Sequence, residues 1–157
     1  MTTTPSSPVT FRTARRDDLD AIVAMLADDD IARSRSGHVA QVTPGISAAF
    51  DEIERDPSNE LIVGEQGGAI VGSLQLTYIP GLSRGGMLRA QIESVRVRAD
   101  LRGQGIGQRL IEAAIDRARQ RGCGVMQLTT DLRRTAAHRF YRRLGFEASH
   151  AGMKRAL

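Results

Sequence analysis

A glycine-rich segment in the second half of the chain joins a strand-like run to a helix-like run. Residues 88–98 are rich in apolar and β-branched side chains, and apolar residues between positions 106 and 118 recur at the spacing of one helix face. Where a strand enters such a loop and a helix follows at once, several backbone N–H groups point at one spot and the helix dipole adds positive potential. The segment therefore predicts an anion-binding loop made of Arg102, Gly103, Gln104, Gly105, Ile106 and Gly107.

The residues around this loop exclude two common phosphate-binding motifs. Gly107 is followed by Gln108 and Arg109, whereas a P-loop requires Lys and then Ser or Thr. A dinucleotide-binding fingerprint follows the first strand of its domain, whereas this loop follows the fourth predicted strand. A tight turn that caps the helix and binds nothing is the remaining alternative.

The two halves of the sequence carry opposite net charge. Residues 1–80 contain 6 basic and 12 acidic side chains, whereas residues 81–157 contain 16 basic and 6 acidic ones. A coding bias toward arginine would enrich both halves, so the asymmetry favours an anionic ligand in the second half. Nucleic acid fits less well, because aromatic residues make up 4% of the chain and tryptophan is absent, which leaves few side chains for base stacking.

The length of 157 residues and the hydrophobic share of 41% fit one globular domain. We expect a flexible polar tail at residues 1–8 and a single domain at residues 9–157. No apolar run is long enough to span a bilayer, and the single cysteine, Cys123, excludes a disulfide framework and a cysteine metal site. We therefore expect a cytoplasmic protein that contacts no membrane and holds no metal ion.

Hydrophobic periodicity predicts both strands and helices. Strands are expected at residues 9–14, 61–63, 69–78, 88–98, 125–130 and 146–153, and helices at residues 15–26, 46–55, 105–121 and 135–144. Gly67 and Gly68 stand between two of the strands and predict a hairpin. Residues 28–44 are polar, and we expect a mobile, solvated loop there. This order of elements predicts an α/β domain with a mixed sheet.

Two motifs in this order resemble the GNAT superfamily of N-acetyltransferases. The segment from Arg102 to Gly107 resembles the loop that binds the pyrophosphate of acyl-CoA, and Tyr141, Gly145 and Phe146 resemble the family's Tyr-x-x-x-Gly-Phe segment. The resemblance covers about residues 11–154 without residues 28–44, and its C-terminal part is similar to aminoalkylphosphonate N-acetyltransferases. It implies a GNAT-like fold in which about four helices flank a mixed, mostly antiparallel sheet of six to seven strands, splayed at the strands around Val95 and Thr129.

The resemblance also implies a reaction. An acetyl group would pass from acetyl-CoA, the cosubstrate, to a primary amine of a small molecule by direct attack in a ternary complex. Tyr141 would protonate the departing thiolate, because a phenol with a pKa of about 10 can supply a proton to a thiolate whose thiol has a pKa of about 8–9. The main chain of Val95 and Val97 would pair with the pantetheine and hold the thioester oxygen. A homodimer is expected from the same resemblance.

Two residues of the predicted site have open roles. Glu93 has the strand parity of Val95 and Val97 and is the candidate base, acting through water; the alternatives are an ion pair with an arginine and deprotonation by bulk water. Arg134 stands where many members of the family have Asn beside the pantetheine. A guanidinium cannot replace that amide, so Arg133 or Arg134 would instead bind a phosphate of CoA or an anionic acceptor, and Asp131 is near enough in sequence to take the place of the amide.

Other polar residues are expected to be structural. His138 lies three residues before Tyr141 and is expected to make a structural hydrogen bond, and Cys123 is expected to pack in a turn. The acceptor pocket is expected to use residues 28–44, 78–81 and 149–152. A protein or peptide N-acetyltransferase, a non-catalytic acyl-CoA-binding module and a basic nucleic-acid-binding domain are the competing functions.

Overall fold

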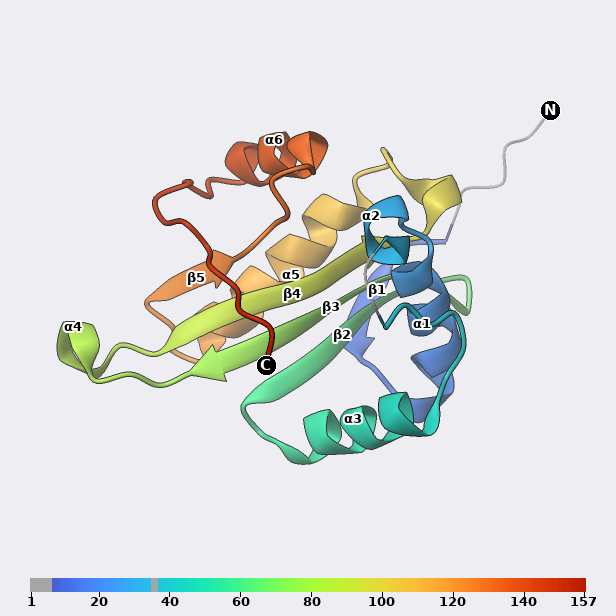
Figure 1. The fold of residues 1–157 in the computed structure, drawn as a ribbon, viewed down its shortest axis with the longest axis horizontal. Coiled ribbons are helices and arrows are strands. Elements are labelled where there is room, and N and C mark those ends of the chain that lie inside the picture. Colours follow the sequence, from blue (N-terminus) through green and yellow to red (C-terminus); the bar gives the residue numbers. More distant parts are fainter. Residues whose placement is uncertain (1–6, 35–36) are drawn as a thin grey trace.

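The computed structural model describes residues 7–34 and 37–157, and within these residues five strands form one sheet (Figure 1). Their order across the sheet follows the sequence: β1 (Thr10–Thr13), β2 (Asn59–Gln66), β3 (Ala69–Ile79), β4 (Arg89–Val97) and β5 (Val125–Leu128). The first four strands pair antiparallel, and β5 pairs parallel to β4. The predicted mixed, mostly antiparallel sheet is therefore confirmed. Of the tail predicted at residues 1–8, residues 1–6 lie outside the described part of the chain.

Four helices of nine residues or more occur where the periodicity predicts them among the described residues: α1 (Leu19–Ala27, after the 3-10 turn Arg16–Asp18), α3 (Pro44–Arg55), α5 (Ile106–Gln120) and α6 (Thr135–Arg143). The side chain of Thr43 accepts a hydrogen bond from the N–H of Ile46 and so caps α3. No helix in the described residues has both the length and the hydropathy to cross a membrane.

The loop expected at residues 28–44 contains a short helix, α2 (Asp30–Arg33), so that expectation is wrong at this point. Asp29 precedes the helix, and its side chain accepts a hydrogen bond from the N–H of Ile31. A second four-residue helix, α4 (Ser83–Gly86), lies at the tip of the arm formed by β3 and β4 (Figure 1). Residues 35 and 36 of the expected loop lie outside the described residues.

Two adjacent residues of β2 show how the helices divide between the faces of the sheet. Ile62 and Val63 are both fully buried, and successive side chains of a strand point to opposite faces. Ile62 packs in a cluster with Leu110 of α5, whereas Val63 packs with Phe50 of α3 and with residues of α1. The helix α5 therefore covers one face, and α1 and α3 cover part of the other, as Figure 1 also shows.

The strand predicted at residues 146–153 does not form, so the sheet has five described strands instead of six or seven. Phe146 packs against the α5 side of the core, but residues 147–157 are all exposed. The segment contains no β-branched residue and does not alternate apolar with polar side chains, so pairing it with the sheet would bury little apolar surface. In Figure 1 it runs as a coil across the sheet.

The pairing between β4 and β5 is short. It begins at Arg89 with Val125 and ends at Ile92 with Leu128, although β4 continues to Val97. From residue 93 onward, the edge of β4 that faces β5 has no strand beside it in the described part of the chain. The two strands thus separate before Val95 and Thr129, where the resemblance implies the splay.

Candidate active site

The glycine-rich loop connects β4 to α5 through the 3-10 turn Ala99–Leu101. Gly103 has φ +80° and Gly105 has φ +79°, and a Cβ at either position would meet no atom within 4 Å. The left-handed backbone, and not lack of space, is therefore what requires glycine here. This backbone turns the chain into α5, whose first N–H groups have no partner within the helix and can bind an anion.

The loop residues predicted to bind the cofactor differ in their exposure to solvent. Residues 102–105 are exposed, whereas Ile106 is buried with Val9 and Val71 and anchors the start of α5. Ile106 can therefore contribute only its backbone to a ligand. The Arg102 guanidinium donates to the carbonyl oxygen of Val97 over 3.3 Å and lies 3.6 Å from the Asp28 carboxylate.

The loop and the Tyr-x-x-x-Gly-Phe segment meet at Gly107. A Cβ built on Gly107 comes 3.5 Å from Cζ of Phe140 and 3.5 Å from Cγ2 of Val97, so α6 lies against the first turn of α5 beside β4. The ring of Tyr141 stacks edge-on with Phe140 at 5.1 Å and with Phe146 at 5.8 Å between centroids. Two motifs separated in sequence by a helix and a strand therefore form one site.

Tyr141 is half-buried beside the splay. Burial raises the pKa of its phenol above the ordinary value of 10.0, and the positive charges of Arg96 and Arg134 act in the opposite direction. The phenol is therefore protonated at neutral pH, as a proton donor must be.

A β-bulge interrupts β4 next to the splay. Glu93 pairs with Gln75 and Arg96 pairs with Ser73, so Ser94 and Val95 together oppose the single residue Leu74. Ser94 is in the left-handed region with φ +55°. Opposed residues point to the same face of a sheet, so Glu93 and Arg96 share the face of Gln75 and Ser73.

The bulge corrects one prediction from the sequence. Val97 pairs with Gly72, which lies against α5, so Val97 faces α5 whereas Glu93 faces away from it. Simple alternation assigned Glu93 and Val97 to one face, and it fails because the bulge adds a residue between them. Glu93 is exposed, and no ion pair with an arginine is formed by it among the described residues.

The backbone carbonyls predicted to pair with the pantetheine contact arginine side chains. Nη1 of Arg96 donates to the carbonyl oxygen of Val95 over 2.8 Å, and Arg102 contacts that of Val97. A carbonyl oxygen has two lone pairs and can accept a second hydrogen bond. The edge of β4 therefore retains the acceptors that an added extended chain requires.

A half-buried ion cluster, which the sequence patterns do not indicate, lies at the same end of β4. Oδ2 of Asp29 accepts hydrogen bonds from Arg96, over 3.1 Å, and from Arg134. Hydrogen bonds and the charges of Arg134 and Arg96 outweigh burial and lower the pKa of Asp29 below its ordinary value. The expectation that residues 28–30 are merely solvated is therefore wrong for Asp29, whose side chain is 12% exposed.

Four of the predicted cofactor residues line one cleft of about 510 Å³, whereas residues 103–107, Glu93 and Tyr141 are not among its lining residues. The walls come from β4, from Arg102 at the start of the glycine-rich loop, from Arg134 just before α6 and from the α1–α2 connection with Asp28 and Asp29. The cleft thus brings Val95, Val97, Arg102 and Arg134 together. The exposed backbone of the loop, the open edge of β4 and Arg102 fit an extended thioester that carries a pyrophosphate.

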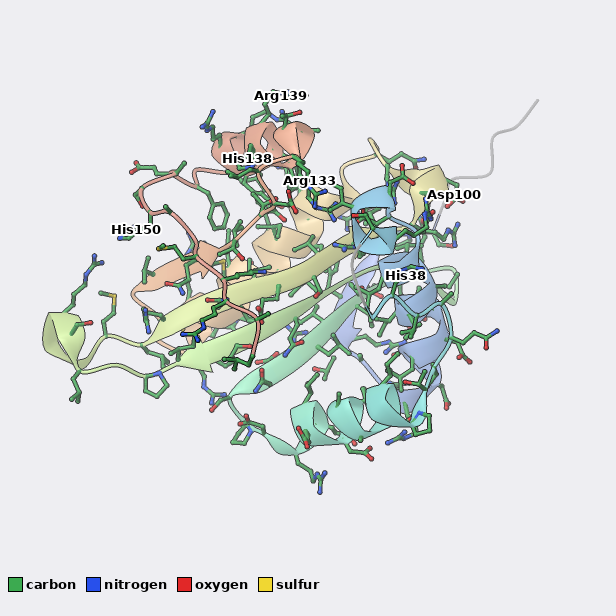
Figure 2. The ribbon with its side chains drawn as sticks, viewed as in Figure 1. His38, Asp100, Arg133, His138, Arg139 and His150 are labelled. Carbon is green, nitrogen blue, oxygen red and sulfur yellow. The ribbon has the colours of Figure 1, made fainter. Side chains whose placement is uncertain are left out.

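The remaining candidates lie outside the cleft. His138 is labelled in Figure 2, and its Nε2 lies 3.1 Å from the carbonyl oxygen of Asp131, a structural hydrogen bond as predicted. Burial raises the pKa of the Cys123 thiol, which packs against the core. Tyr78 of the expected acceptor pocket is buried on the α5 face and donates to Glu60 over 2.7 Å. Gly152, also of the expected acceptor pocket, lies beside Thr129: a Cβ built on Gly152 would come 3.4 Å from Cγ2 of Thr129.

No metal site is evident in the described residues, where no three or more His, Cys, Asp or Glu side chains are grouped so that they could hold an ion.

Comparison with known proteins agrees with this geometry. The family model described as "Acetyltransferase (GNAT) family" matches residues 21–146. An aminoalkylphosphonate N-acetyltransferase of Salmonella typhimurium is 28% identical, over 94% of this chain and 90% of the relative. A streptothricin acetyltransferase of Streptomyces lavendulae is 31% identical, over 93% of this chain and 85% of the relative.

A solved structure is also similar over nearly the whole chain. The crystal structure of a protein described as a transcriptional regulator from Bacillus halodurans superposes with a TM-score of 0.90 at 48% identity. The match covers 96% of this chain and 100% of that one.

Proposed function

The chain belongs to the acetyltransferase (GNAT) family, whose members use acetyl-CoA as cosubstrate, and we propose that it acetylates a primary amine of a small molecule by direct attack in a ternary complex. The observation that carries this proposal is the contact of Gly107 with Phe140 and Val97. Because this contact holds the first turn of α5, β4 and α6 together, we expect a donor bound by the loop to have its thioester near the Tyr141 phenol.

In this proposal each part of the chain has one task. N–H groups of the loop and of the first turn of α5 bind the pyrophosphate, and Arg102 adds a positive charge. The backbone of Val95 and Val97 binds the pantetheine, with the N–H of Val95 donating to the thioester oxygen as negative charge develops there. These groups orient the donor without forming a covalent bond to it.

Two side chains move the protons. Glu93 lies on the exposed face of β4 and accepts a proton from the acceptor ammonium through water, which leaves a neutral amine. The amine nitrogen bonds to the acetyl carbon as the carbon–sulfur bond breaks, Tyr141 gives its proton to the departing sulfur, and the nitrogen releases its surplus proton to water, which leaves a neutral amide and a thiol. The Tyr141 phenolate then regains a proton from solvent and Glu93 releases its proton to solvent, so the enzyme returns to its starting state.

The acceptor is proposed to be a small molecule, and two features support this. The α1–α2 connection forms one wall of the cleft and contacts Arg96, Arg102 and Arg134. The relative from Salmonella typhimurium is named for aminoalkylphosphonates, which are small amines. We also propose a cytoplasmic location and a homodimer; sedimentation velocity tests the latter.

Thiol release from acetyl-CoA tests this function directly. The purified protein is incubated with acetyl-CoA and, in turn, with small amines, amine-bearing peptides and buffer alone. The proposal predicts saturable release of CoA with at least one small amine and none above the buffer rate with peptides. Release with peptides only would indicate a protein N-acetyltransferase, and CoA binding without release in any sample would indicate a non-catalytic module.

A further inference from the structure

Arg96 of β4 and Arg134, just before α6, meet at a single carboxylate oxygen, Oδ2 of Asp29. The side chains of Arg96, Arg134 and Asp29 are 19%, 25% and 12% exposed. Two positive charges and one negative charge are thus largely withdrawn from water at the wall of the cleft. Among these three side chains the positive charges outnumber the negative one, and such a group attracts an anion.

The geometry of the cluster leaves donors for such an anion. A guanidinium group has five N–H donors, and among the described residues the Arg134 guanidinium hydrogen-bonds only Asp29. Because both arginines share one oxygen of Asp29, their guanidinium groups are held next to each other. Two adjacent guanidinium groups can bind the several oxygens of one oxyanion by charge-assisted hydrogen bonds.

The cluster lies beside the splayed end of β4 and is separate from the pyrophosphate loop. Arg96 follows Val95 at the bulge in β4, and Arg134 precedes α6, the helix that contains Tyr141. At the loop, Arg102 contacts Asp28 instead of Asp29. The arginines of the cleft therefore form two groups, one at the loop and one at the Asp29 carboxylate.

The bulge in β4 places Arg96 on the same face as Glu93, the proposed base. Because the bulge absorbs one residue, the two side chains are separated by about two strand positions, roughly 7 Å along the strand. An amine close to Glu93 and an anion close to Arg96 would thus fit into one small molecule.

We propose that Arg96 and Arg134 bind an oxyanion group of the acceptor, so that the enzyme acetylates compact amines that also carry a phosphonate, phosphate or carboxylate. This inference rests on the proposed acetyl transfer and names its acceptor class. Asp29 positions the two guanidinium groups, and the anion of the acceptor fixes the amine between Glu93 and the thioester. Neutral amines of the same size lack this anchor.

Matched acceptors test the inference on the unaltered protein. β-Alanine is compared with its neutral amide, and 2-aminoethylphosphonate with ethylamine, by the rate of CoA release from acetyl-CoA. We expect kcat/KM to be at least about tenfold higher for one or both anionic members, since one charge-assisted hydrogen bond is worth about that factor. A larger effect for the phosphonate or for the carboxylate identifies the oxyanion. Equal or higher values for both neutral members would overturn the inference and leave the proposed function intact.

Charge-removing variants then assign the effect to the cluster. Arg96→Gln and, as a second variant, Arg134→Gln should raise KM for the anionic acceptor at least about tenfold and should change KM for the neutral acceptor much less. Arg139→Gln is the control, because Arg139 is exposed on the outer side of α6 (Figure 2) and loses the same charge. If both variants raise KM for acetyl-CoA and leave the anionic preference intact, the arginines bind the donor and the inference is wrong.

A binding measurement separates this inference from the proposed reaction. Calorimetry of 2-aminoethylphosphonate and ethylamine against the protein in the presence of CoA requires no turnover. Binding of the phosphonate alone, lost in Arg96→Gln, supports the subsite even if no acetyl transfer is seen. No binding of the phosphonate to a protein that acetylates ethylamine contradicts it.

Discussion

Gly107, in the first turn of α5, lies against the ring of Phe140 in α6, and a Cβ on Gly107 would be 3.5 Å from Cζ of that ring. This contact joins the loop that begins α5 to the segment that carries Tyr141. The position of Tyr141 relative to the loop proposed to bind acetyl-CoA therefore depends on the packing of α6 against α5. This packing is rigid, unlike a mobile segment.

Substitution by alanine is predicted to have different effects at Gly105 and at Gly107. Gly105→Ala should lower the free energy of unfolding by about 1–2 kcal/mol, because φ +79° is strained for alanine, and should weaken CoA binding by shifting the loop N–H groups. Gly107→Ala makes only ordinary van der Waals contacts and should keep CoA affinity, with stability raised by up to about 1 kcal/mol. Calorimetry measures the CoA affinity of each variant, and thermal denaturation measures its stability. Equal CoA affinity in the two variants would contradict the proposal that the loop backbone binds the pyrophosphate.

Tyr141→Phe is predicted to lower kcat by about 10–10³-fold, because the thiolate then leaves without a proton donor. KM for acetyl-CoA should change little, since the ring and its contacts with Phe140 and Phe146 remain. The matched control is Tyr78→Phe, which loses a buried hydroxyl that donates to Glu60. The control should lose about 1 kcal/mol of stability and keep its kcat. An unchanged kcat in Tyr141→Phe would remove Tyr141 from the mechanism.

The pH dependence follows from the direction of the Tyr141 pKa. Burial raises this pKa above 10.0, so the phenol stays protonated in the folded enzyme up to at least pH 10. Loss of the acid form should therefore not limit kcat below pH 10, and Tyr141→Phe should lower kcat there without changing the shape of the profile. The same shift makes a stability contribution that is present below pH 10 and is lost as the pH rises through the folded-state pKa. An alkaline limb below pH 10 that vanishes in Tyr141→Phe would contradict this.

Glu93→Gln is predicted to lower kcat/KM by about 10²-fold, the lower end for a general base, because Glu93 is exposed and bulk water can partly replace it. The acid limb of the pH–rate profile should change in this variant. Glu54→Gln on α3, which is also exposed, serves as the control. If the profiles of Glu93→Gln and the control coincide, deprotonation by water is sufficient.

Asp18 is predicted to stabilise the start of α1 through its charge. Its carboxylate accepts two hydrogen bonds from Arg12, at 2.7 and 2.9 Å, and one from the N–H of Arg15 at 2.7 Å. The hydrogen bonds from Arg12 lower the pKa of Asp18 below 3.8, so its contribution is present above that value and is lost as the pH falls through the folded-state pKa. Asp18→Asn should cost about 2 kcal/mol at pH 7 and less near pH 2. Urea unfolding at both pH values measures this difference; an equal cost would contradict it.

Local sequence signals predicted most of the fold. The two glycines at 67 and 68 have φ +56° and +79° and close the hairpin as expected, and the apolar face of α5 covers the sheet. The strand predicted at residues 146–153 is wrong, because the segment has no β-branched residue and would bury little apolar surface against the sheet. In the site, the loop and the Tyr141 segment were identified by motif.

The parts of the site that the sequence did not predict depend on tertiary geometry. Ser94 adopts φ +55° without being glycine, so nothing in the pattern marks the bulge that reverses the face of Glu93 relative to Val97. Asp29 contacts Arg96 and Arg134, which are 67 and 105 residues away in sequence. It lies in a polar run whose pattern predicts a solvated loop. Only the folded arrangement shows that these three charges share one cleft.

Titration calorimetry of coenzyme A into the purified protein tests the central claim that the backbone from residue 102 to residue 107 binds the pyrophosphate. We predict saturable binding to one site, weakened in Gly105→Ala and retained in Gly107→Ala. A folded protein that shows no binding of coenzyme A at millimolar concentration would contradict the account.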